Sequence, residues 1–303
     1  MRIFNLSVLS ILLLFLLSCN STPPSTSNSE DTTKLHISAT FFPLYDLTKS
    51  IAGDKGIVES VVPANIEPHD YELTPVDIRK VTTADVFVTM GISFAQFESS
   101  LIASIPSSVV IIPAAKDIGI EFISSSKDQN KAKIDPHVWL SVKNAKQMAQ
   151  KIAEGLMQVD TKNKEYYEKN VLQLQNELTA LDNEFTKGLA QCKKNVLLVN
   201  HDSFSYLARD YGFTTIHISG LEPEVEPTPL QIKRLIDEAK KNNLSYIMYE
   251  SLVDPRIAKT IESEVHAEIL ELNPLEGADN PEDTYVTLMR KNLNNVRIAL
   301  ECT

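Results

Sequence analysis

The sequence predicts an α/β protein of two lobes, each with a mostly parallel sheet and flanking helices, joined by a long rigid linking helix. Three observations support this fold class. The chain has 303 residues, of which 43% are hydrophobic, enough to build two separate cores. Short apolar runs alternate with segments of helical periodicity in both halves of the chain, which is typical of parallel strands covered by helices. Between the halves, residues 161–189 form one amphipathic helical pattern longer than the others.

The first half of the chain alternates strand and helix patterns. Thr74 and Pro75 predict the start of a helix, because threonine caps the first turn and proline fits the first helical position. Residues 119–134 are polar and predict a surface loop. We expect strands at residues 36–42, 58–62, 84–90 and 109–112, and further helices at residues 44–52 and 94–104.

The middle of the chain predicts the long helix, and the second half repeats the alternation. Residues 144–156 are helical, and residues 161–189 predict a helix of roughly 40 Å with one buried stripe. The stripe consists of Val171, Leu174, Leu178, Leu181, Phe185 and Leu189. Beyond it we expect strands at residues 195–199, 214–218, 245–249 and 268–272, and helices at residues 204–211, 229–242, 255–265 and 282–300.

The amino-terminal residues predict a lipid anchor. An apolar run from Val8 to Leu17 is too short to span a bilayer, which needs about 20 apolar residues. The sequence Leu16-Leu17-Ser18-Cys19 looks like a bacterial lipobox, so we expect cleavage before Cys19 and lipidation of its thiol. The alternative is a plain signal peptide with a cysteine there by chance. Residues 20–33 are rich in Ser, Thr, Pro and Asn, as in a flexible tether.

These patterns divide the chain into five parts. We expect a signal peptide at residues 1–18, the lipidated cysteine and tether at 19–34, an N-terminal lobe at 35–157, the linking helix at 158–190 and a C-terminal lobe at 191–303. A long helix between two lobes should limit hinge motion. Any ligand held between the lobes should therefore be released by local loop movement more than by wide opening.

Composition and motifs exclude several functions. The formal charge is −11, from 29 basic and 40 acidic residues, which offers no electrostatic basis for binding nucleic acid or an anionic membrane surface. The chain has only 9 glycines and lacks a GxGxxG or Walker loop, so nucleotide chemistry would belong to a partner. It also lacks the Gly-x-Ser-x-Gly elbow of serine hydrolases. Cys192 and Cys302 could form a disulfide, but the sequence leaves that open.

Three histidines lie in similar polar junctions after apolar runs. His69 and His137 belong to the first lobe, and His201 directly follows a predicted strand of the second lobe. Glu276 follows the last predicted strand. Ligands in open α/β sheets bind beyond the carboxyl ends of the strands, so these four side chains could meet in the cleft between the lobes. Their wide spacing along the chain makes no local metal-binding motif.

Three imidazoles and one carboxylate fit zinc, which prefers tetrahedral coordination by nitrogen, oxygen and sulfur. Mn²⁺ prefers more oxygen ligands, so it is the weaker alternative within the same kind of site. A zinc-dependent hydrolase is the alternative from another class. Catalytic zinc usually keeps a position open for water, whereas four protein ligands close the site. We therefore expect a carrier and not an enzyme.

The sequence resembles the metal-binding lipoproteins of ABC importers, specifically the zinc and manganese solute-binding group. The resemblance extends from Leu35 to the final predicted helix. Its carriers are Glu67-Pro68-His69-Asp70-Tyr71-Glu72, Asp135-Pro136-His137-Val138-Trp139-Leu140, His201-Asp202-Ser203-Phe204-Ser205-Tyr206-Leu207, Gly220-Leu221-Glu222-Pro223-Glu224-Val225-Glu226-Pro227 and Asn273-Pro274-Leu275-Glu276-Gly277.

The resemblance implies residues, partners and a location. Residues matching His69, His137 and His201 hold the metal in that family, together with a carboxylate in the loop of residues 273–277. Many members carry an aspartate early in this loop, where Asn273 could align, but members with an Asn-Pro-Leu-Glu sequence use its glutamate, here Glu276. The expected partner is an ABC permease, and the expected state is an extracytoplasmic monomer, lipid-anchored to a bacterial membrane. Some members were first described as adhesins, for which this sequence offers nothing specific.

Some features of the sequence fall outside this expected site. His36, His217 and His266 open, occupy or precede predicted strands, so structural roles are expected. The polar loop of residues 119–134 contains no histidine, although zinc-binding members often carry a His-rich tract there. Capture of a second metal ion by this loop is therefore not expected.

Overall fold

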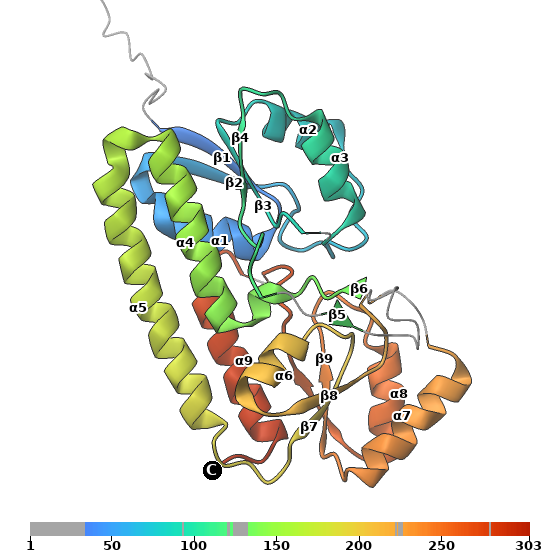
Figure 1. Ribbon diagram of the computed structural model, residues 1–303. Coiled ribbons are helices and arrows are strands. Elements are labelled where there is room, and N and C mark those ends of the chain that lie inside the picture. The colour runs from blue at the N-terminus through green and yellow to red at the C-terminus, as the bar shows by residue number, and fades with distance from the viewer. Residues whose placement is uncertain are drawn as a thin grey trace, which may run out of the picture. The chain divides into compact units, whose positions relative to one another are not determined.

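The first lobe is built on a four-stranded parallel sheet with the order β2-β1-β3-β4 (Figure 1). Its strands are β1 (Leu35–Ala39), β2 (Gly56–Ser60), β3 (Val86–Thr89) and β4 (Val110–Pro113). This computed structural model describes residues 34–303 except 93, 120–121, 124–132, 222, 224–226 and 279. The strand order changes direction between β1 and β3, because β2 is added on one side of β1 while β3 and β4 are added on the other. Ligands bind at such a point in sheets of this kind.

The helices of the first lobe begin where local chemistry favours a start. They are α1 (Phe42–Ala52), which continues into the 3₁₀ turn η1 (Gly53–Lys55), α2 (Pro75–Thr82) and α3 (Gln96–Ser104). The predicted cap of α2 is confirmed, because the Thr74 hydroxyl accepts the Asp77 amide while Asp77 accepts the Thr74 amide. The first strand ends three residues before the predicted bound, because Phe42 and Pro43 already belong to α1.

Two long helices pack side by side in Figure 1, and the longer one continues along the second lobe. They are α4 (Val142–Val159) and α5 (Lys164–Gly188), joined by the 3₁₀ turn η4 (Thr161–Asn163). Five of the six predicted stripe residues are buried α5 residues, and Leu189 is buried just after the helix. At 25 residues α5 is about 38 Å long. It contacts α1 of the first lobe and α9 (Tyr285–Ala299) near the end of the chain, as the sequence predicted for a helix joining two lobes.

The second lobe carries two parallel strand pairs. β7 (Val196–Val199) pairs with β8 (Thr214–His217), β9 (Tyr246–Tyr249) pairs with β10 (Glu268–Glu271), and β7 lies beside β9. The surrounding helices are α6 (Ser205–Tyr211), α7 (Pro229–Lys241), α8 (Arg256–Val265) and α9. The last helix begins three residues later than predicted, because Thr284 accepts the Thr287 amide and forms its cap.

Other predictions changed or fall outside the described residues. The polar stretch of residues 119–134 is not all loop, since β5 (Phe122–Ile123) and β6 (Lys133–Ile134) form an antiparallel pair. Cys19, with its predicted lipid anchor and tether, lies outside the described residues. Among the residues that are described, no helix has the length and apolar character needed to cross a membrane.

A disulfide joins Cys192 to Cys302, a pairing that the sequence had left open. The residues next to the two cysteines also contact each other. The Thr303 amide donates to the Gln191 carbonyl, and the Lys194 ammonium lies 2.7 Å from a Glu301 oxygen. The bridge spans 110 positions and ties the end of the chain, after α9, to the segment between α5 and β7.

We predict that replacing both cysteines, in Cys192→Ser/Cys302→Ser, lowers the thermal unfolding temperature. Closing a loop of about 100 residues stabilises a folded chain by up to about 4.7 kcal/mol in the chain-entropy model, because the cross-link restricts the unfolded ensemble. Calorimetry under non-reducing conditions measures the fall in unfolding temperature. After reduction, the parent chain should unfold at the same temperature as the double variant. Equal melting of the oxidised parent and the variant would contradict the prediction.

Candidate metal centre

Four side chains from four loops converge on one point. His69 lies between β2 and α2, His137 precedes the 3₁₀ turn η3 (Val138–Leu140), His201 follows β7, and Glu276 lies between β10 and α9. One ligand atom from each lies within 4.8 Å of the others. The structure thus brings together all four residues predicted from the sequence, two from each lobe.

Five of the six spacings among these atoms match the edges of a tetrahedron around zinc, and the sixth, between His69 and His201, is within 4.8 Å. The Nε2 atom of His137 lies 3.3 Å from Nε2 of both His69 and His201. Oε1 of Glu276 lies 3.2 Å from His69 Nε2 and 3.5 Å from Nε2 of His137 and His201. Zinc ligands 2.0–2.1 Å from the ion at tetrahedral angles are about 3.3–3.4 Å apart. The five distances therefore fit one zinc ion at the centre.

The site is closed to solvent on nearly every side. The side chains of His137, His201 and Glu276 are fully buried, and that of His69 is 5% exposed. Four protein ligands in such a site leave no open position for a reactive water, as in carrier and structural zinc sites. His69 is the one ligand through which solvent reaches the site.

The motif acid-Pro-His positions both histidines of the first lobe in the same way. Glu67 Oε1 accepts the His69 amide at 3.0 Å, and Asp135 Oδ1 accepts the His137 amide at 3.0 Å. Each proline sits between acid and histidine, where its fixed φ limits the backbone of the turn. Asp135 also bonds the His137 ring, with 2.8 Å between Oδ1 and Nδ1.

Glu250 plays the matching part in the second lobe. Its Oε2 lies 2.7 Å from Nδ1 of His201, and its Oε1 accepts the His201 amide at 3.2 Å. Glu250 is 2% exposed and directly follows β9. Glu250 is not among the residues predicted from the sequence. The signal was present, because an acidic residue at the carboxyl end of a buried strand satisfies the same rule that identified His201.

These carboxylates determine the tautomers of two ligands. An ionised carboxylate only accepts, so Nδ1 of His137 and Nδ1 of His201 must carry the proton. Their Nε2 atoms then present lone pairs to each other across 3.3 Å. Facing lone pairs repel unless a cation lies between them. The donor set is thus arranged for a metal ion, with the Glu276 carboxylate supplying negative charge.

The site shifts the pKa values of its members. Burial lowers the pKa of His137 and His201, but hydrogen bonds and charge from Asp135, Glu250 and Glu276 outweigh it, and both pKa values end above their usual range. Burial alone would raise the pKa of Glu276, yet the neighbouring imidazoles hold it well below the usual range. Burial, together with the charge of Glu276, raises the pKa of Glu67 to about 9.

Asn273 shapes the loop that presents Glu276 and lies outside the cluster of ligand atoms. Its side-chain oxygen accepts the Leu275 amide at 2.7 Å. The Asn292 side chain accepts the Asn273 backbone N–H and donates to the Asn273 carbonyl. Leu275 has a left-handed φ of 59°, a conformation that Asn273 helps to hold. Of the two residues weighed from sequence, Glu276 is therefore the one that meets the histidines.

Aromatic side chains support the ligands of the first lobe. The Trp139 ring lies 5.2 Å from the His137 ring, and its indole N–H donates to the Pro274 carbonyl at 2.7 Å. Trp139 is fully buried, so it packs in the core and also connects the His137 segment to the Glu276 loop. Phe94 stacks on Phe41 and lies 5.1 Å from the His69 ring.

The other sequence features remain apart from the site. His36, His217 and His266 are not in the ligand cluster. His217 Nδ1 lies 3.6 Å from an Asp202 oxygen, and His266 adopts a left-handed φ of 58° at the end of α8. The acidic run of Glu222, Glu224 and Glu226 lies outside the described residues.

Two α/β lobes that share a buried site of three histidines and a glutamate define a metal-binding solute-binding protein. Comparison with known proteins gives the family. A family model described as zinc-uptake complex component A periplasmic, ZnuA, matches residues 37–299, and the chain belongs to this family.

Curated relatives match nearly the whole chain. The high-affinity zinc uptake system protein ZnuA of Bacillus subtilis (strain 168) is 31% identical over 314 residues, covering 97% of both chains. The zinc-binding lipoprotein AdcA of Streptococcus pneumoniae (strain TIGR4) is 32% identical over 311 residues. That match covers 98% of this chain but 61% of AdcA, which is longer.

Solved structures share the fold. The laminin-binding protein Lmb of Streptococcus agalactiae, titled a bifunctional protein with adhesin and metal transporting activity, aligns with a TM-score of 0.80 at 28% identity. The Zn(II)-bound ZnuA-like domain of Streptococcus pneumoniae AdcA aligns with a TM-score of 0.76 at 32% identity. Both alignments cover 88% of this chain and 99% of the other.

We predict that Glu250→Gln lowers the affinity for zinc by roughly 10–100-fold, as loss of a carboxylate behind a zinc-bound histidine usually does. The amide can no longer fix the proton on Nδ1 of His201 as the carboxylate does. Competitive titration against a chelator of known affinity measures the change. Asp70→Asn is the control, because the exposed Asp70 adjoins His69 without contacting the site. Equal affinities of the Glu250 variant and the parent would contradict the prediction.

Proposed function

We propose that this chain is an extracytoplasmic solute-binding protein that captures Zn²⁺ through His69, His137, His201 and Glu276 and delivers it to an ABC permease in the membrane. The observation that carries the proposal is the set of 3.2–3.5 Å distances among the four ligand atoms, which fits tetrahedral zinc. Membership of the zinc-uptake family and the Zn(II)-bound structural relative support it.

Zinc is preferred to manganese as the cargo. Three neutral imidazoles and one carboxylate oxygen suit zinc, whereas manganese favours sites with more oxygen. The two curated relatives described above are named for zinc. The same closed coordination supports carriage over hydrolysis, because a zinc hydrolase needs an open position for water.

The remaining parts of the chain complete the proposal. Lipidation of Cys19 would hold the mature protein at a bacterial membrane, with residues 20–34 as a tether. Residues 35–157 and 191–303 would act as the two lobes, and residues 158–190 as the linking helix. The protein would work as a monomer, because each lobe supplies two of the four ligands.

We predict that Glu276→Ala removes zinc binding, whereas Asn273→Ala retains one zinc per chain. Glu276 supplies a ligand atom, and its loss should weaken binding by more than the roughly 10–100-fold typical of an outer residue. Asn273 only shapes the loop, so its replacement should lower the melting temperature instead. Elemental analysis and competitive titration with zinc and manganese measure both. Stoichiometric zinc in the Glu276 variant would refute the site, and tighter manganese than zinc binding would refute the cargo.

We predict that zinc affinity falls steadily as pH is lowered from 8 to about 5. His137 and His201 have pKa values above the usual 6.5, so protons compete with zinc already near neutral pH. The stability of the metal-free fold depends on pH in the opposite direction. A raised histidine pKa stabilises the folded state below the unfolded pKa, and this stabilisation is lost as pH rises through the folded pKa. Calorimetry in buffers of different ionisation heat measures affinity and proton release. Affinity independent of pH over this range would contradict the coordination.

A further inference from the structure

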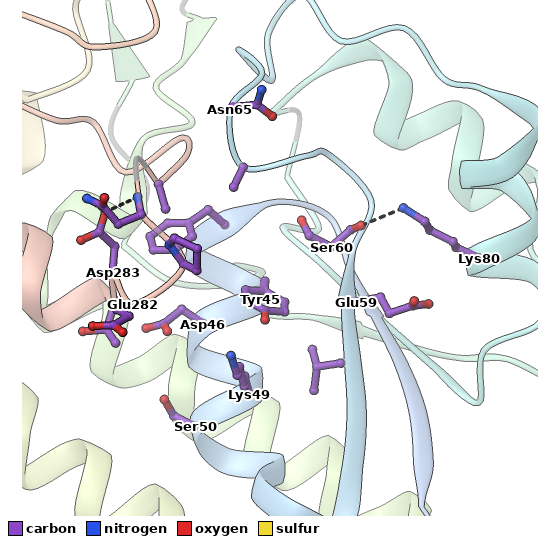
Figure 2. Close-up of a pocket in the computed structure, with 17 residues that line it drawn as sticks. Tyr45, Asp46, Lys49, Ser50, Glu59, Ser60, Asn65, Lys80, Glu282 and Asp283 are labelled. Atoms are coloured by element: carbon purple, nitrogen blue, oxygen red, sulfur yellow. Dashed lines mark hydrogen bonds between the residues drawn. The ribbon is translucent and has the colours of Figure 1, made fainter. Parts of the chain in front are cut away.

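A large cavity is lined in part by the loops that carry His69 and Glu276. It has a volume of about 1030 Å³ and is lined by α1, β2, Ala64 and Asn65 of the first lobe and by residues 278–284 of the second, except for position 279. Figure 2 shows Tyr45, Asp46 and Lys49 of α1 in the middle of this lining, with Glu282 and Asp283 on one side and Glu59, Ser60 and Lys80 on the other.

The cavity borders the contact between the two ligand loops. The Ala278 amide donates to the Ala64 carbonyl at 2.9 Å. Ala278 lies two residues after Glu276, and Ala64 lies five residues before His69. Gly277 allows this approach, because a Cβ atom there would lie 2.1 Å from the Ala64 oxygen. We call the Ala64–Ala278 contact the loop latch. If the loop segments at Ala64 and Ala278 separated, the loops that carry His69 and Glu276 would move apart.

A buried carboxylate in the same cavity connects to the other side of the metal centre. Asp46 is 7% exposed, and its Oδ2 accepts the Tyr285 amide at 2.8 Å. The Tyr285 hydroxyl donates to the Trp139 carbonyl at 2.7 Å, two residues beyond His137. Among the described residues, the hydrogen bond from the Tyr285 amide reaches Oδ2 and not the other Asp46 oxygen, Oδ1. It remains available to a donor entering the cavity.

The charge of the lining favours a cation. Four carboxylates, Asp46, Glu59, Glu282 and Asp283, face two ammonium groups, Lys49 and Lys80. Lys80 already donates to the Ser60 carbonyl at 3.2 Å. The carboxylates do not form a metal site, because the described residues contain a single group of ligand atoms close enough to share an ion, the one at His69. A cationic side chain from another protein fits the cavity better than an ion does.

We propose that this cavity is the docking point for a lysine or arginine side chain of the partner permease, whose entry opens the loop latch and releases zinc. The inference rests on the proposed function, since it names the surface through which that delivery occurs. A carrier with a closed site needs a contact that loosens its ligands only at the permease. The cavity supplies one, because its lining includes Ala64 and Asn65 of the loop that carries His69 and Ala278 of the loop that carries Glu276.

The latch is tested with a cross-link in the purified protein. Residues joined by a backbone hydrogen bond are close enough for a disulfide, whose Cα atoms lie about 4.4–6.8 Å apart. In Ala64→Cys/Ala278→Cys, oxidation should slow zinc transfer to excess EDTA at least tenfold relative to Ala64→Cys alone treated in the same way. Transfer at the rate of the single variant, with the cross-link verified by mass spectrometry, would overturn the role of the latch.

The docking point is tested by reversing charge in the lining. Glu59→Lys/Glu282→Lys alters two exposed carboxylates, and Glu264→Lys on α8 is the matched control far from the lining. In cells that depend on the full-length chain for zinc, the double variant should reduce uptake of radioactive zinc at least tenfold. Its zinc affinity in calorimetry should stay within twofold of the parent, and the control should match the parent in both measurements.

The outcomes separate this inference from the proposed function. If the parent chain binds no zinc in calorimetry, the proposed function is wrong. If it binds zinc but the Glu59/Glu282 variant supports normal uptake, only the docking point is wrong. A second zinc equivalent that binds the parent and is lost in the variant would assign the cavity to a metal ion and overturn the inference.

Discussion

The structure depends on holding three imidazole nitrogens and a carboxylate oxygen within 4.8 Å of each other in a buried site. Without a cation, facing lone pairs and desolvated charge oppose this arrangement. The protein supports it with hydrogen bonds from behind, since Asp135 and Glu250 each accept both the ring N–H and the backbone N–H of one histidine. Zinc removes the repulsion, so metal binding and closure of the site are coupled.

The need to hold ligands from both lobes together explains the hydrogen bonds that join the lobes. The Trp139 indole bonds the Pro274 carbonyl, the Tyr206 hydroxyl bonds the Asp135 carbonyl, and the Tyr285 hydroxyl bonds the Trp139 carbonyl. Each bond links a segment carrying a first-lobe ligand to the second lobe. Because α5 contacts both lobes over much of its length, large hinge motion would break extensive packing. Local movement of the ligand loops is the less costly way to open the site.

Much of the fold and the four converging residues could be predicted from sequence, and the failures have physical causes. Strand-helix alternation identified both lobes, and Thr74 and Pro75 marked a helix start, because these signals are local. The start of α9 was missed because two threonines, Thr284 and Thr287, cap each other there. Glu250 follows a predicted strand, but its contact with His201 depends on β9 lying beside β7, an arrangement that local sequence does not encode. The choice between Asn273 and Glu276 needed the resemblance first and the loop geometry afterwards.

X-ray absorption spectroscopy at the zinc edge of the loaded protein tests the central claim most directly. The spectrum should show four nitrogen or oxygen ligands at about 2.0–2.1 Å, with the multiple-scattering signature of three imidazoles and no sulfur. In Glu276→Gln the imidazole signature should remain while the carboxylate contribution changes. A shell of five or six oxygen-rich ligands, or fewer than three imidazoles, would contradict a tetrahedral site built from His69, His137, His201 and Glu276.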